Sequence, residues 1–150
     1  MAESKRYILL VHGPNLNLLG TRQPEIYGTE TLDDINRNIV LQSSDACEYL
    51  TVQHNAEGDI IDAIHKAGTD ANCVGIVLNA GAYTHYSYAI ADAIASVDKP
   101  VIEVHLSNVF ARDEQFRSTS VIAPVCVGSL AGFGWPGYVM AAKFLEANYM

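Results

Sequence analysis

The fold is decided by residues 7–12, YILLVH, and the segment that follows at once, residues 13–20, GPNLNLLG. An almost wholly apolar run that ends at Gly-Pro is typical of a strand buried on both faces, as in a parallel sheet. Residues 73–78, CVGIVL, show the same pattern near the middle of the chain. Because parallel strands are joined by crossovers, usually helices, the sequence predicts an α/β fold.

Outward from this stretch, strand and helix patterns alternate. Further strands are predicted at 47–53, 101–105 and 121–127, and Pro124 indicates an edge position for the last of them. Helices are predicted to begin after Thr31, over 59–67, over 88–97 and from Pro136. The predicted inward residues of the first helix are Leu32, Ile35 and Ile39, and those of the last are Val139, Met140, Phe144 and Leu145. Right-handed crossovers make five such units a doubly wound, flavodoxin-like sheet in three αβα layers.

Composition limits the class of protein. The 150 residues suit a single domain spanning 1–150, and 49% hydrophobic residues exclude a disordered chain. The net charge of −8 argues against nucleic acid as a partner, and no apolar run approaches a membrane span. The start lacks a signal-peptide pattern, and Cys47, Cys73 and Cys126 suit free thiols in a reducing compartment, so we expect a cytoplasmic protein.

Polar residues gather where the predicted strands end. Residues 13–28 read GPNLNLLGTRQPEIYG, residues 79–85 read NAGAYTH, and residues 102–108 read IEVHLSN. In a doubly wound sheet, ligands bind outside the carboxyl ends of the strands, so these segments should meet at one site. They supply two histidines, a tyrosine near an arginine, and several carboxamides. This set suits proton transfer around a polar anion.

These three motifs, in this order and spacing, resemble those of type II 3-dehydroquinate dehydratases, and the similarity covers nearly the whole chain. The resemblance implies removal of water from 3-dehydroquinate to give 3-dehydroshikimate through an enolate. It also implies a flavodoxin-like fold, no metal or organic cofactor, and homododecamers built from trimers.

The resemblance assigns four catalytic residues. Tyr27 corresponds to the general base, and Arg22 to the arginine that stabilises its phenolate. A free tyrosine has a pKa near ~10, so roughly one in a thousand is ionised at neutral pH without such help. Asn15 corresponds to the residue that holds a water against the enolate oxygen, and His105 to the general acid. Glu103, two residues earlier on the same strand, would share a face with His105.

Substrate binding is carried over in the same way. The corresponding positions are Asn79, His85, the backbone amides of Leu106 and Ser107, Arg117, and Asp92, which the family supplies from a neighbouring subunit. Gly20 and Gly28 bracket the catalytic segment as hinges of a lid. Two departures stand out: Gln23 replaces the family's usual glutamate, and the stretch after His105 is one residue longer than in some members. Arg112 therefore competes with Arg117 for the substrate arginine.

The remaining histidines, cysteines and tyrosines have plainer interpretations, and the sequence argues against other functions. His12, His54 and His65 are assigned structural or solvent-facing positions, the cysteines are assigned to the core, and Tyr83, Tyr86 and Tyr88 could line the pocket or a subunit contact. A flavodoxin-like flavin or nucleotide-binding module would need a hydroxyl-rich phosphate loop, which GPNLNLLGT lacks. The G-x-G-x-x-G at 132–137 has no βαβ unit after it. A phosphoacceptor domain would need acidic residues where the first and third predicted strands end, and these positions are His12 and Asn79. A Schiff-base dehydratase would need a lysine, and none lies in these motifs.

Overall fold

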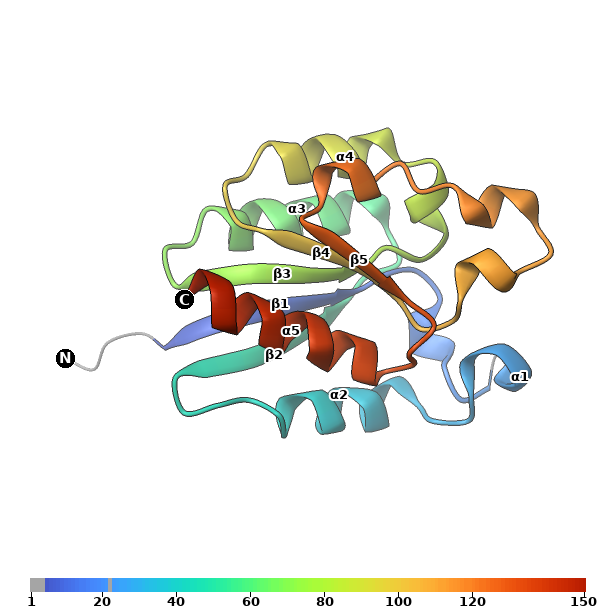
Figure 1. Ribbon diagram of the computed structural model, residues 1–150, viewed down its shortest axis with the longest axis horizontal. Coiled ribbons are helices and arrows are strands. Elements are labelled where there is room, and N and C mark those ends of the chain that lie inside the picture. The colour runs from blue at the N-terminus through green and yellow to red at the C-terminus, as the bar shows by residue number, and fades with distance from the viewer. Residues whose placement is uncertain (1–4, 22) are drawn as a thin grey trace.

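The computed structural model describes residues 5–21 and 23–150 (Figure 1). Within them, five parallel strands form one sheet in the order β2-β1-β3-β4-β5. The strands are β1 (Arg6–His12), β2 (Cys47–Gln53), β3 (Cys73–Asn79), β4 (Val101–His105) and β5 (Gly128–Ala131). The chain passes from β1 to β2 on one side and returns to β3 on the other. The crevice between β1 and β3 is therefore the switch point at which such sheets bind ligands.

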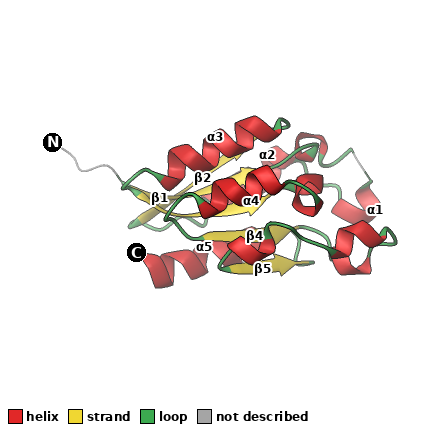
Figure 2. Ribbon diagram, turned by 90° about the horizontal axis from the view of Figure 1, so that it is seen from above, coloured by secondary structure: helices red, strands yellow, loops and turns green. Residues whose placement is uncertain are grey.

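Helices cover both faces of the sheet, which confirms the predicted flavodoxin-like three-layer fold. They are α1 (Pro24–Tyr27), α2 (Leu32–Val40), α3 (Glu57–Gly68), α4 (Tyr88–Ala95) and α5 (Pro136–Tyr149). Figures 1 and 2 show α3 and α4 on one face and α2 and α5 on the other. Short 3-10 turns lie in the connections: η1 (Leu16–Leu18), η2 (Gly81–His85), η3 (Val109–Ala111), η4 (Gln115–Ser118) and η5 (Ala123–Val125).

The central strand β1 explains why the apolar run is continuous. Ile8 and Leu10 pack in the core beneath α2 and α5, whereas Leu9 and Val11 pack in the core beneath α3 and α4. Successive side chains of a strand point to opposite faces, and both faces are covered here. The strand therefore has no polar face.

Helix α2 begins as predicted. The Thr31 hydroxyl accepts a hydrogen bond from the Asp34 backbone N–H, and the Asp34 carboxylate accepts one from the Thr31 N–H. This reciprocal capping box satisfies backbone donors that have no partner within the helix. Leu32, Ile35 and Ile39 are buried beneath the sheet, also as predicted.

The strand predicted at 121–127 is wrong. Its middle forms the 3-10 turn η5, whose Pro124 lacks the N–H that a sheet ladder needs, and β5 begins later at Gly128. The apolar residues misled the prediction because Ile122 is buried in the core beneath α3 and α4, with Val121 and Cys126 packed against it.

The predicted inward face of the last helix is also partly wrong. Met140 and Phe144 are exposed, whereas Tyr138, Ala141 and Leu145 are buried. Small residues such as Ala141 occupy part of the face that packs on the sheet, so the positions of the larger apolar side chains did not predict which face of α5 is buried.

Candidate active site

A small polar pocket of about 60 Å³ lies at the carboxyl ends of β1, β3 and β4. In Figure 1, α1 and the orange segment after β4 lie beyond the arrowheads at this end of the sheet. The lining residues come from the three segments that sequence analysis singled out: Pro14, Asn15, Leu16, Asn79, Gly81, Ala82, His85, His105, Leu106, Ser107, Val109 and Arg117. Segments that are far apart in the sequence are therefore brought together because the parallel strands end at the same edge of the sheet.

The structure groups most, but not all, of the predicted site residues. Those that line the pocket are Asn15, Asn79, His85, His105, Leu106, Ser107 and Arg117. Arg22 lies outside the described residues. The backbone of Tyr27 ends α1, and its side chain is likewise outside the description. Asp92 lies on an exposed part of α4 and does not line the pocket within the described chain.

His105 is paired with a buried carboxylate. Its Nε2 lies 3.2 Å from Oε1 of Glu103, and both residues are buried at the end of β4. The two are separated by one residue on a strand, so their side chains share a face as predicted. The carboxylate thereby fixes the ring orientation and compensates positive charge when the imidazole is protonated.

Glu103 is held as an anion by its neighbours. Burial opposes ionisation, but hydrogen bonds from His105, Ser120 and Ser129 outweigh it and lower the pKa of the carboxyl. Ser129 Oγ donates to Oε2 at 2.6 Å, and Ser120 Oγ donates to Oε1. Neither serine could be predicted from the sequence, because they lie 17 and 26 residues from Glu103 and Ser129 belongs to a strand that was predicted at the wrong position.

His85 faces the same pocket with a defined tautomer. Its Nδ1 lies 2.7 Å from the carbonyl oxygen of Thr119, so Nδ1 carries the hydrogen and Nε2 of the neutral ring is an acceptor. The ring lies parallel to that of His105, with 6.4 Å between centroids, and meets Phe116 edge-on. Two imidazoles thus form one wall of the pocket.

Arg117, rather than Arg112, supplies the cation that lines the pocket. Its Nε lies 3.3 Å from Glu114 Oε2, and its guanidinium packs over the Phe116 ring at 4.8 Å. Arg112 Nε lies 3.9 Å from the same carboxylate oxygen. The pKa of Glu114 is lowered, first by a backbone hydrogen bond and further by the two arginines.

The turn after β1 presents Asn15 to the pocket. Asn15 adopts a left-handed conformation with φ of 69°, which asparagine tolerates better than most residues, and its N–H donates to Asn55 Oδ1 at 3.0 Å. Gly13 lets this turn approach β3 closely, because a Cβ there would lie 2.7 Å from the Asn79 carbonyl oxygen. Asn15 and Asn79 both line the pocket.

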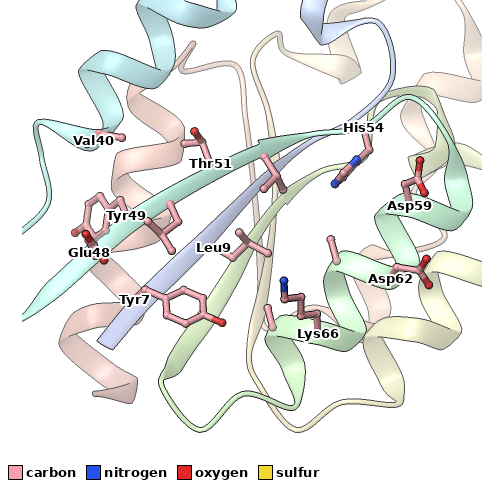
Figure 3. Close-up of a pocket in the computed structure, with 14 residues that line it drawn as sticks. Tyr7, Leu9, Val40, Glu48, Tyr49, Thr51, His54, Asp59, Asp62 and Lys66 are labelled. Carbon is pink, nitrogen blue, oxygen red and sulfur yellow. The ribbon is translucent and has the colours of Figure 1, made fainter. Parts of the chain in front are cut away.

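A larger hollow of about 840 Å³ lies elsewhere, between β2 and α3 (Figure 3). Tyr7, Leu9, Tyr49, His54, Asp59 and Lys66 are among its lining residues. It shares no residue with the strand-end pocket. The larger hollow also has titratable groups in its walls, but the segments 13–28, 79–85 and 102–108 converge on the smaller pocket, so size does not identify the site of chemistry here.

A metal site would need several His, Cys, Asp or Glu side chains close together. In the described part of the chain, no group of three or more such side chains is placed to hold a metal ion. No described helix is long and apolar enough to cross a membrane.

Comparison with known proteins agrees with the motifs. Residues 6–146 match the family model described as dehydroquinase class II. A 3-dehydroquinate dehydratase of Roseiflexus castenholzii is 54% identical over 141 residues, covering 92% of this chain and 87% of the relative. One of Ruegeria pomeroyi is 54% identical, covering 94% and 93%. The crystal structure of a type II dehydroquinase from Butyrivibrio crossotus superposes with a TM-score of 0.90 at 48% identity, covering 96% and 99%.

Proposed function

The chain belongs to the class II dehydroquinase family, a family of hydro-lyases that convert 3-dehydroquinate to 3-dehydroshikimate in the shikimate pathway, and from this premise we propose how its residues divide the reaction. The pairing of His105 with Glu103 beside two asparagines carries the proposal. A flavin-binding role has no support in these relatives.

The first step is removal of a proton from the carbon next to the ketone. Tyr27 takes this proton as phenolate, and Arg22 stabilises the phenolate beforehand. The electron pair left on carbon moves onto the ketone oxygen as an enolate. Asn15, at the pocket wall, holds a water molecule against this developing oxyanion.

The second step is loss of the hydroxyl group. The enolate collapses to the ketone, a carbon–carbon double bond forms, and the carbon–oxygen bond breaks. His105 gives its proton to the departing oxygen, which leaves as water. Glu103 supports this step because its carboxylate, 3.2 Å from Nε2, compensates the charge of the protonated ring. Proton transfer back from Tyr27 to His105, through solvent, restores the starting state.

Substrate is held by neutral donors and one cation. The backbone amides of Leu106 and Ser107 bind the carboxylate, which suits an anion in a protein with a net charge of −8. Asn79, His85 and Arg117 bind the hydroxyl groups and complete the pocket wall. No cofactor takes part in this scheme.

The decisive experiment replaces the base. Tyr27→Phe is expected to lower kcat by a factor on the order of 10³ or more, because general base catalysis is lost. Ultraviolet absorbance of the enone product measures turnover without added metal, and circular dichroism checks the fold. Tyr149→Phe, at the far end of α5, is the matched control. Full activity of the Tyr27→Phe variant would contradict the proposed mechanism.

The same proposal includes a homododecamer of trimers. Tyr88 is 72% exposed on α4, four residues before Asp92, so the two share one helix face. Large apolar side chains are also exposed on other elements, including Phe110, Phe116, Met140 and Phe144. Burial of the α4 face against a neighbouring copy would bring Asp92 to that copy's pocket.

Sedimentation and activity test this assembly together. Tyr88→Glu is expected to give smaller particles in analytical ultracentrifugation and to lower kcat/KM, because Asp92 no longer reaches a neighbour. Asp92→Asn should lower kcat/KM while the particle size stays unchanged. A wild-type monomer with full activity at all concentrations would contradict the assembly. A cytoplasmic location, suggested by the free thiols of Cys47 and Cys73, is tested by cell fractionation.

A further inference from the structure

A series of hydrogen-bonded polar side chains, three of them buried, runs from the pocket to helix α2. It links Asn79 at the end of β3, Tyr138 in α5, His12 at the end of β1, and Asn36 in α2. His12 and Tyr138 have no exposed surface, and Asn79 is 4% exposed. Buried polar groups are costly unless they are paired, so this chain requires a reason.

The orientation of the Asn79 side chain is set at its oxygen. The backbone N–H of Gly81 donates to Asn79 Oδ1 at 3.1 Å, and an N–H can bond only to an acceptor. Nδ2 therefore faces Tyr138 and donates to its Oη at 2.9 Å. One hydrogen of the amide is used in this bond, and the other remains for the pocket that Asn79 lines.

The remaining hydrogen bonds of the series have the same donor-to-acceptor direction, from Asn79 toward Asn36. Burial lowers the pKa of His12 to about 4, so the ring is neutral and carries one hydrogen at physiological pH. Nε2 lies 2.7 Å from Asn36 Oδ1 and donates to it, which leaves Nδ1 as an acceptor for the Tyr138 hydroxyl at 3.0 Å. Every hydrogen bond then has one donor and one acceptor: Asn79 to Tyr138, Tyr138 to His12, and His12 to Asn36.

We propose that Tyr138 and His12 are positioning residues that lock the Asn79 amide with its remaining N–H toward the pocket, where it meets an acceptor oxygen of the substrate. This inference rests on the proposed role of Asn79 in binding. Without the Tyr138 hydroxyl, the amide loses the partner that holds Nδ2, and only the Gly81 N–H bond to Oδ1 still orients it, so the N–H that faces the pocket is held less firmly. The two residues touch no substrate themselves.

A double-mutant cycle tests the chain. Tyr138→Phe is expected to raise the KM for 3-dehydroquinate about five- to tenfold, the range expected for one buried hydrogen bond. The same substitution in an Asn79→Ala background should add no further increase, because the amide it positions is gone. Tyr49→Phe is the matched control, since Tyr49 is equally buried and donates to Glu146, away from the pocket. Circular dichroism and thermal unfolding monitor the fold of each variant.

Substitutions at His12 provide an independent readout if Tyr138→Phe does not fold. His12→Gln retains an acceptor for the Tyr138 hydroxyl, whereas His12→Met has similar bulk and offers only a weak one. The glutamine variant is expected to raise KM less than the methionine variant does. Equal KM values for the two would overturn the proposal.

The two ways of failing are distinct. If Asn79→Ala leaves KM unchanged, Asn79 does not bind substrate, and the proposal falls together with that assignment. If Asn79→Ala raises KM but Tyr138→Phe has the same effect in both backgrounds, the binding role stands and the positioning chain is wrong.

Discussion

At the scale of single residues, the Glu103 carboxylate is the most constrained charge in the pocket wall. It is 1% exposed, and three neighbours donate to it, so it remains an anion despite burial. Removing one partner of a buried charged pair costs far more than removing an exposed one. Its role in the reaction can therefore be separated from its packing by conservative substitution.

Glu103→Gln preserves shape and removes the charge next to His105. We expect kcat to fall roughly ten- to hundredfold with little change in KM, because the carboxylate acts when the ring carries a proton. Steady-state kinetics measure both constants. Ser129→Ala serves as control, since it deletes one hydrogen bond to Glu103 and keeps the charge. An equal loss of kcat in both variants would show that hydrogen bonding, and not charge, matters.

At the scale of elements, the start of α2 anchors the carboxyl end of the segment that carries Tyr27. Its capping box joins Thr31 to Asp34 at the point where this segment enters the helix. Gly28 ends α1 with φ of 85° and ψ of −178°, a conformation nearly restricted to glycine. The two features fix the backbone on the carboxyl side of the predicted catalytic tyrosine.

Thr31→Ala is expected to destabilise the protein by about 1 kcal/mol, the usual cost of losing a side-chain N-cap. Urea denaturation followed by circular dichroism measures the change. Thr29→Ala is the matched control, since it removes a threonine from the same loop, two residues before the cap. Equal stability of the two variants would mean that the capping box contributes nothing.

The elements also show what the sequence could reveal. Central strands are buried on both faces, so the apolar runs of β1 and β3 predicted them directly, and the polar residues after them marked the pocket. Edge strand β5 reads GSLA and, among the described residues, pairs with β4 alone, so its sequence has little pattern to detect. The chain through His12 and Tyr138 joins residues 126 positions apart, and no local pattern announces such a contact.

At the scale of the whole molecule, two buried groups make stability depend on pH. The folded-state pKa of His12, about 4, lies below its ordinary value of 6.5, so the unfolded chain binds more protons between these values. The contribution of His12 to the free energy of unfolding is therefore complete above pH 6.5 and is lost as the pH drops toward 4. The lowered pKa of Glu103 acts in the same direction, and its contribution is lost below roughly pH 4.3.

We expect the free energy of unfolding to fall by on the order of 3 kcal/mol per chain between pH 6.5 and 4 because of His12. Urea titrations at several pH values test this. In His12→Gln the slope over this interval should flatten, while the steeper loss at lower pH remains. An unchanged slope in that variant would assign the pH dependence to other groups.

The modest volume of the strand-end pocket has a kinetic consequence. A volume of about 60 Å³ is enough for a few water molecules and is small for a substituted six-carbon ring. We therefore expect substrate binding in two stages, in which the loops around the pocket move apart before the substrate enters. Stopped-flow traces should accordingly show an observed rate that levels off at high ligand concentration, at a ceiling set by loop opening.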